Sequence, residues 1–234
     1  MTKLAQIQTV QKQKQAGLVY ISLAALFIAA LITCNLIANK FVTVNLGFKT
    51  FVLSAGVLPY PITFLITDIL SELYGRKNTS YVVLSGFFAS LLVLLILYLG
   101  HAFPAIADSP VTDAEYQSVF QNSGRVILAS MLAYLSAQFI DVRIFHYFKK
   151  LTKGKALWFR NNFSTFFSQL VDTILVTSVI FMGLKGAGYI FDLVLDGWLF
   201  KVLCAAADTL IIYPVVFALR NYFGLKPGEE IHWH

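Results

Sequence analysis

Residues 160–173 read RNNFSTFFSQLVDT and begin an apolar segment that continues to Leu184. When this segment is drawn as a helix, with 100° per residue, its polar side chains fall within one arc of about 140°. These side chains are Asn161, Asn162, Thr165, Ser168, Gln169, Asp172 and Thr173. Amides, hydroxyls and a carboxylate on a membrane-spanning helix are costly against lipid, so we expect them to face protein or a wet cavity. The stretch therefore predicts one wall of a polar-solute site within a membrane.

The composition indicates an integral membrane protein. The chain has 234 residues, of which 58% are hydrophobic and only 13% charged, and its mean hydropathy is +0.71. Soluble domains carry about 25% charged residues. The net charge of +6 is modest, and the basic residues flank apolar runs, which indicates membrane topology rather than nucleic-acid binding. Cys34 and Cys204 lie in apolar segments and predict neither a disulfide nor a metal site.

Apolar runs of about 20 residues predict an all-α membrane protein with six transmembrane helices. The expected helices cover residues 17–38, 57–74, 80–99, 125–148, 161–184 and 198–220. They make one transmembrane domain, residues 17–222, between polar tails at residues 1–16 and 223–234. If both tails are cytoplasmic, the inner segments hold twelve Lys and Arg residues and the outer segments five. The positive-inside rule therefore predicts cytoplasmic termini.

Two connections carry local signals. Residues 40–54, KFVTVNLGFKTFVLS, are rich in β-branched and aromatic residues around Asn45-Leu46-Gly47, which predicts a short hairpin or re-entrant piece. Pro59 and Pro61 are then expected to break or kink the start of the second helix. The long outer loop at residues 101–124 is acidic, and we expect a short helix beginning near Thr112.

Five carboxylates fall within the expected helices. They are Asp68, Glu72, Asp141, Asp172 and Asp208. At 1.5 Å per residue, Asp172 and Asp208 lie about 17–18 Å from the inner boundary, near the middle of a hydrocarbon core about 30 Å thick. A bundle does not need so many acids for stability, because each is expensive to hold ionised in low dielectric. We therefore expect at least two of them to serve transport or ligand binding.

The basic residues within the helices suggest partners for these acids. Glu72 lies near Arg76 and Lys77 in the sequence, which favours a structural role for it. Arg143 needs an anionic partner at its own depth, and Asp68 or Glu72 is expected to supply it. Lys201 is seven residues from Asp208 and shares its helix face, so it is expected to neutralise Asp208 in part or to draw anions inward.

Short similarities around Asp68, Asp141 and Asp172 suggest an internal repeat of three helices plus three. Since three is odd, the two halves would have opposite topology, an arrangement common in transporters. The chain has no GxxxxGK[ST], HExxH, GxSxG or CxxC motif, so neither an intrinsic ATPase nor these classes of enzyme are expected, and no cofactor is predicted.

Three stretches resemble the queuosine precursor transporter family, also called the vitamin uptake transporter family. They are ITDILSELYGRK at residues 66–77, AYLSAQFIDV at residues 133–142, and RNNFST at residues 160–165 running on to Gln169 and Asp172-Thr173. The resemblance covers all six expected helices. It implies a bacterial inner-membrane, multi-pass importer of the cyano or aminomethyl 7-deazaguanine precursors of queuosine, with no obligatory ATPase partner.

The candidate substrate-binding residues combine this resemblance with the chemistry of the side chains. Asp172 is expected to accept from the adjacent donors of a guanine-like ring, with help from Asn162, Gln169 and Asn161. Asp68, Asp141 or Asp208 would form a second polar wall or carry a proton. The remaining candidates are Thr165, Ser168, Glu72 and Arg143.

Two other functions stay open on the sequence. One is a substrate-binding subunit that works only with a separate ATPase and scaffold, because small six-helix vitamin-binding subunits have a similar size and composition. The other is a membrane enzyme that uses paired aspartates, such as Asp172 and Asp208, on a lipid or a peptide. Gly86 and Ser90 also offer a close-approach surface, which fits either a homodimer or packing inside one chain.

Overall fold

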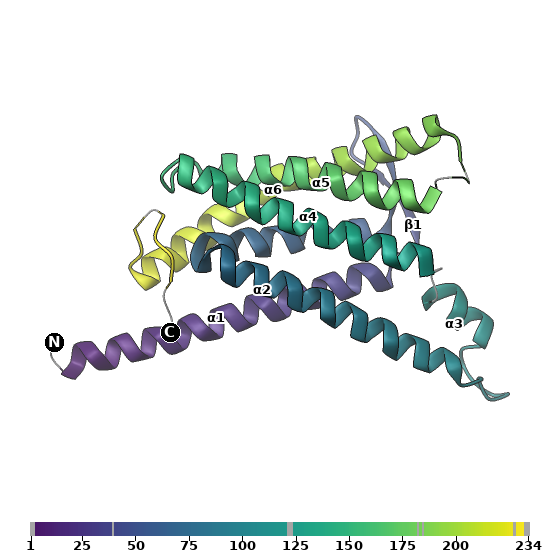
Figure 1. Ribbon diagram of the computed structural model, residues 1–234, viewed down its shortest axis with the longest axis horizontal. Helices are drawn as coiled ribbons and strands as arrows, with labels where there is room; N and C mark the ends of the chain where they lie inside the picture. Colours follow the sequence, from purple (N-terminus) through teal and green to yellow (C-terminus); the bar gives the residue numbers. More distant parts are fainter. Residues whose placement is uncertain are drawn as a thin grey trace.

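A computed structural model describes residues 3–38, 40–120, 124–181, 183, 185–226 and 228–231. It consists of long helices packed along a common direction, with a two-stranded hairpin and a short helix at one end (Figure 1). The elements are α1 (Lys3–Leu36), β1 (Phe41–Asn45), β2 (Thr50–Ser54), η1 (Ala55–Val57), α2 (Tyr60–Ala102), α3 (Asp113–Phe120), α4 (Gly124–Leu151), α5 (Leu157–Phe181) and α6 (Ala187–Phe223). The polar residues 3–16 continue α1 as helix.

Helix α2 is two helices joined by a sharp turn at Gly75. This glycine has φ 79° and ψ 170°, a backbone conformation essentially restricted to glycine. The hydroxyl groups of Ser71 and Thr79 lie 3.4 Å apart, whereas residues eight apart in a straight helix are separated by about 12 Å. The chain therefore turns back at Gly75, as Figure 1 shows. This turn separates the expected helices at residues 57–74 and 80–99.

The connection between α1 and α2 is the predicted hairpin. Strands β1 and β2 are antiparallel, with Val44 opposite Phe51. Gly47 takes a positive φ of 86° at the turn, and its N–H donates to the Asn45 side chain at 2.8 Å. Phe51 is fully buried against Phe200 of α6, which fixes the hairpin over the bundle. The two prolines do not kink α2 but mark its beginning: Pro59 is the N-cap residue and Pro61 follows in the first turn.

The short helix expected near Thr112 is confirmed as α3. The backbone N–H and the hydroxyl of Thr112 both donate to Glu115, each at 2.8 Å, and form a capping box. These hydrogen bonds to the charged form lower the pKa of the Glu115 carboxyl. The Tyr116 hydroxyl then donates to the Leu97 carbonyl at 3.1 Å and ties α3 to the end of α2.

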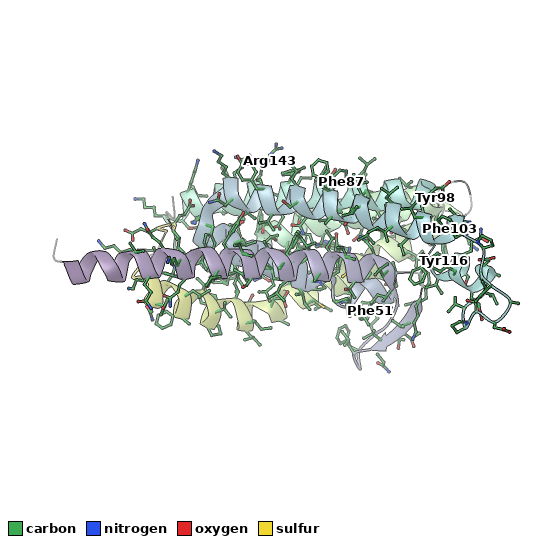
Figure 2. All side chains as sticks on the ribbon, turned by 90° about the horizontal axis from the view of Figure 1, so that it is seen from below. Phe51, Phe87, Tyr98, Phe103, Tyr116 and Arg143 are labelled. Atoms are coloured by element: carbon green, nitrogen blue, oxygen red, sulfur yellow. The ribbon has the colours of Figure 1, made fainter. Side chains whose placement is uncertain are left out.

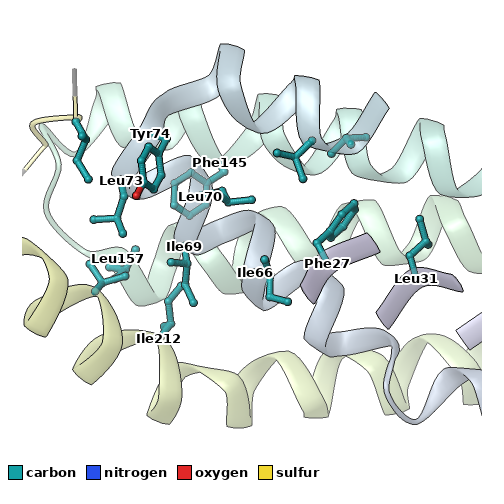
Figure 3. Packing of buried hydrophobic residues seen from close by; sticks show 14 of the residues in the cluster. Phe27, Leu31, Ile66, Ile69, Leu70, Leu73, Tyr74, Phe145, Leu157 and Ile212 are labelled. Atoms are coloured by element: carbon teal, nitrogen blue, oxygen red, sulfur yellow. The ribbon is translucent and has the colours of Figure 1, made fainter. Parts of the chain in front are cut away.

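The apolar core lies where both halves of α2 pack against the other helices. Phe27 of α1, Leu70 and Leu73 of α2, Phe145 of α4 and Ile212 of α6 are fully buried there (Figure 3). Many large apolar side chains remain on the outside instead, as Figure 2 illustrates with all side chains drawn. Examples are Leu92, Leu95, Ile96, Leu210 and Phe217. An apolar exterior of this extent fits a lipid environment.

The structure confirms a helical chain with membrane-spanning character. Within the described residues, three helical segments are long and apolar enough to cross a bilayer: Val10–Leu36, Ala55–Ala102 and Ala187–Phe223. The second contains the turn at Gly75. The close approach at Gly86 is internal, because a Cβ there would lie 2.8 Å from the Phe27 ring and 2.9 Å from the Tyr134 hydroxyl.

Candidate functional site

A cavity of about 470 Å³ lies inside the bundle at the end that carries the hairpin and α3. Cavities of this size are typical of small-molecule sites. It is lined by residues of α1, both halves of α2, α3, α4, α5 and α6, together with the hairpin and η1. Most of the lining is apolar, and its polar side chains include Asn35, Tyr60, Ser90, Asp172 and Lys201. An apolar wall with a few polar groups can orient a flat, polar solute.

A buried ion pair is the polar centre of this cavity. Lys201 Nζ of α6 donates to Asp172 Oδ2 of α5 at 2.6 Å, and the two side chains are only 7% and 5% exposed. Lys201 also donates to Thr173 Oγ1 at 3.3 Å. The Tyr60 hydroxyl of α2 donates to Asp172 Oδ1 at 3.3 Å, and the ammonium group lies 4.8 Å from the centre of the Tyr60 ring. Three helices thus contribute to one charged, hydrogen-bonded group at the cavity wall.

This pairing corrects the expectation that Lys201 neutralises Asp208. The seven-residue spacing does place both on one side of α6, and both line a second, much smaller cavity. The ammonium group nevertheless bonds to Asp172, which α5 places 2.6 Å from it.

Among the polar side chains of the cavity, Asn35 and Tyr60 were not singled out from the sequence, and Ser90 was named only as a packing residue. Tyr60 follows the proline at the start of α2, and nothing in its neighbourhood indicates a polar contact with residue 172. Ser90 is 3% exposed, lines the cavity, and its hydroxyl has no partner among the described residues. Its sequence signal was the spacing to Gly86, which pointed to helix packing instead.

The polar face predicted for α5 contacts three helices, α2, α4 and α6. Asn161, Thr165 and Gln169 line the small cavity together with Asp208 of α6, and this space of about 10 Å³ is close to the volume that holds one water. Tyr60 and Lys201 line both cavities, so the two cavities lie on either side of the same side chains. The polar face of α5 is therefore buried in protein, as the sequence predicts.

Other members of that face point elsewhere. Ser168 donates to Asp141 Oδ1 of α4 at 3.0 Å. Asn162 donates to Thr209 of α6 and to the Trp158 carbonyl, both at 2.8 Å, and is absent from the lining of either cavity. Asp141 in turn lies within hydrogen-bonding reach of Asp68 on α2, and both are at most 1% exposed.

Glu72 lies at the opposite end of the bundle, in a dense cluster of ion pairs. The guanidinium of Arg160 meets both of its carboxylate oxygens, at 3.0 and 3.2 Å. Arg220 approaches to 2.5 Å, and Lys149 lies 3.8 Å away while also binding Glu230 at 3.0 Å. Glu72 and Arg160 are fully buried. The structural role expected for Glu72 fits this geometry, but its partners come from α4, α5 and α6 rather than from Arg76 and Lys77.

The expected partnership of Arg143 with Asp68 or Glu72 is wrong. Arg143 is exposed at the edge of the bundle in Figure 2, and the described residues give it no ion pair. Residues 141 and 143 are about 200° apart around α4, so burying Asp141 turns Arg143 outward. The cations that do reach the buried acids are Arg160, Arg220, Lys149 and Lys201.

A buried charge pair beside a solute-sized internal cavity in a helical membrane protein is an arrangement that polytopic transporters use. Residues 54–215 match the family described as putative vitamin uptake transporter, and the chain belongs to this family. The expected resemblance is confirmed, and membership makes the protein a transporter rather than an enzyme.

Curated relatives carry a more specific description. The chain is 31% identical over 176 residues to a probable queuosine precursor transporter of Bacillus subtilis, covering 75% of this chain and 73% of the relative. It is 25% identical over 215 residues to the queuosine precursor transporter of Escherichia coli, covering 88% and 89% respectively. A probable queuosine precursor transporter of Haemophilus influenzae is 25% identical over 183 residues, with 73% and 72% covered. No solved structure matches the chain.

Proposed function

We propose that the protein imports 7-deazaguanine precursors of queuosine, in the cyano or aminomethyl form, across the bacterial inner membrane. The observation that carries this proposal is the Asp172–Lys201 pair on the wall of the 470 Å³ cavity. The names of the curated relatives support the substrate class.

The charge pair suits the polar edge of a guanine-like ring. That edge presents a ring N–H and an exocyclic amine, which a carboxylate accepts as a bidentate pair, beside a carbonyl oxygen. Asp172 would accept from the two donors while Lys201, at its side, donates to the carbonyl. Tyr60 would give up its hydrogen bond to Asp172 and pack with the apolar lining against a face of the ring. One ion pair would thus read three adjacent atoms of the base.

Alternating access fits the positions of the cavity and the Glu72 ion-pair cluster at opposite ends of the bundle. The cavity lies toward the hairpin, while the Glu72 cluster joins α2, α4, α5 and α6 at the other end. With cytoplasmic termini, this cluster would form the inner closure and the cavity would open to the outside. The six transmembrane passes are α1, the two halves of α2, α4, α5 and α6, and their three-plus-three division would supply the two moving halves.

The test is uptake by purified protein in liposomes that contain no ATPase. Radiolabelled cyano- and aminomethyl-deazaguanine should enter, and unlabelled guanine analogues that lack the exocyclic amine should compete weakly. Asp172→Ala should lower the affinity about 10- to 150-fold, because it removes a charged hydrogen-bond partner worth about 1.5–3 kcal/mol.

Asp196→Ala is the matched control, since Asp196 forms the other Asp–Lys pair of α6, with Lys49 at 2.5 Å, outside the cavity lining. Its uptake should equal that of the wild type. Uptake that depends on an added ATPase module would favour the substrate-binding subunit instead. Normal affinity in a well-folded Asp172→Ala protein would refute the role of Asp172.

A further inference from the structure

Asp68 and Asp141 form a second buried acidic site that the proposed substrate site does not use. They lie on the first half of α2 and on α4, 1% and 0% exposed, with their carboxyl groups within hydrogen-bonding reach of each other. Two ionised carboxylates are both acceptors and repel each other, so a buried contact of this kind requires a proton between them.

The surroundings of the two acids are unequal. The hydroxyl groups of Ser164, Thr165 and Ser168 lie within hydrogen-bonding reach of Asp141. Neither oxygen of Asp68 has a donor among the described residues. Asp141 is therefore suited to the ionised form, and Asp68 to the protonated form that donates to it.

No free cation neutralises the pair within the described part of the chain. The positive charge that acts on Asp68 is that of Arg160 of α5, whose guanidinium is already bound to both oxygens of Glu72. Asp208 of α6 adds a further negative charge. Neither Arg160 of α5 nor Asp208 of α6 therefore neutralises the pair. Its net charge depends on how many protons it binds.

The pair also has polar access. Thr165 reaches Asp141 and lines the small cavity, which is close to the volume of one water and shares the lining residues Tyr60 and Lys201 with the large one. One turn before Asp141, the amide of Gln138 is fully buried with neither its nitrogen nor its oxygen partnered among the described residues. A buried amide without a partner is rare, and a water or another polar group beside it would satisfy it.

We propose that the Asp68–Asp141 pair is a proton-binding site that couples import to the proton gradient, an inference that rests on the proposed transport function. A hydronium ion outside transfers its proton to the pair and leaves as water, and the proton passes to water inside after the conformational change. The pair alternates between one bound proton with a charge of −1 and two bound protons with no charge. In its neutral form the pair can pass through the conformational change without an ionised carboxylate buried in the low-dielectric interior.

The experiment uses full-length protein in liposomes. Its substrate is the cyano-deazaguanine, which is uncharged and so neither carries nor releases a proton itself. Counterflow exchange at equal pH measures transport alone, and accumulation under an inside-alkaline gradient measures coupling. With one proton per base, a gradient of one pH unit supports about tenfold accumulation. Asp141→Asn should lose this accumulation and keep counterflow, because its amide imitates a permanently protonated Asp141 and the pair, with Asp68 protonated, stays neutral throughout. Asp196→Asn should keep both.

Infrared spectroscopy tests the bound proton without transport. The wild type at neutral pH should show the carbonyl stretch of a buried protonated carboxylic acid, Asp68→Asn should lose it, and Asp141→Asn should keep it. If Asp141→Asn fails to fold, Asp141→Glu keeps an ionisable carboxyl and should retain gradient-driven accumulation.

Two results would overturn the proton site: accumulation that follows the gradient normally in Asp141→Asn, or the absence of a protonated carboxyl in the wild type. Absence of any counterflow by the wild type would instead refute the proposed transport function, so the two failures can be told apart.

Discussion

Replacing Glu72 by Gln should destabilise the protein more than any neutralisation at its surface. Glu72 is fully buried and is the shared anion for Arg160, Arg220 and Lys149. Glutamine keeps the shape of the side chain but leaves Arg160, which is also fully buried, without its counter-charge. Removing one partner of a buried ion pair costs about 3–5 kcal/mol.

This cost applies to Arg160 alone and not to all three cations around Glu72. Lys149 keeps Glu230 at 3.0 Å and the carbonyls of Ser71 and residue 72 at 3.2 and 2.9 Å. Arg220 is 14% exposed and has partial access to solvent. For a chain of this length, about 3–5 kcal/mol corresponds to a fall in Tm of about 6–20 °C.

The assay is thermal unfolding of the purified protein in detergent, with Glu230→Gln as the matched control. Glu230 binds the same Lys149, but its side chain is 36% exposed, and such pairs contribute at most about 1 kcal/mol. The control should therefore shift the Tm by no more than about 4 °C. Equal shifts for the two variants would refute the view that Glu72 is the shared anion of the closure.

The remaining predictions concern the cavity and the turn in α2. Asp172→Asn and Lys201→Met should each cost about 3–5 kcal/mol in the free energy of unfolding, because each leaves a buried charge unpaired, while the double variant should recover most of that loss. A double-mutant cycle by chemical denaturation measures this coupling, and additive losses would contradict the pairing. Gly75→Ala should cost about 1–3 kcal/mol, since alanine does not tolerate φ 79° with ψ 170°, and the Glu230 carboxylate would also have to move away from the added Cβ. The control is Gly188→Ala, because a Cβ at Gly188 would meet open space, whereas one at Gly86 would meet closely packed side chains. Gly188→Ala should be less destabilising than Gly75→Ala.

Several features of the fold follow from local sequence, because local chemistry specifies them. Asn45-Leu46-Gly47 between β-branched residues is sufficient for the hairpin, and Thr112 with Glu115 is sufficient for the start of α3. The polar arc of α5 depends only on helical periodicity and on the cost of exposing amides to lipid. Its burial was therefore predictable without knowing the neighbouring helices.

The pairing of charges was not predictable in this way. Asp172 and Lys201 are 29 residues apart, and Glu72 and Arg160 are 88 apart. Expectations based on nearness in sequence assigned Lys201 to Asp208 and Glu72 to Arg76 and Lys77. Which buried acid meets which base depends on how each helix is rotated and where it crosses its neighbours, and these choices are made by packing of the whole bundle.

The amino-acid sequence by itself determined that the protein belongs in a membrane, that its segments are helical, and which side of α5 must avoid lipid. These properties arise from residue type and spacing along one segment. Only the tertiary structure decided that Asp172 borders a cavity with Lys201, that Asp68 meets Asp141, and that Arg143 is left outside. Each of those outcomes requires side chains from separate helices to reach one point, and a few ångströms of shift would exchange one partner for another.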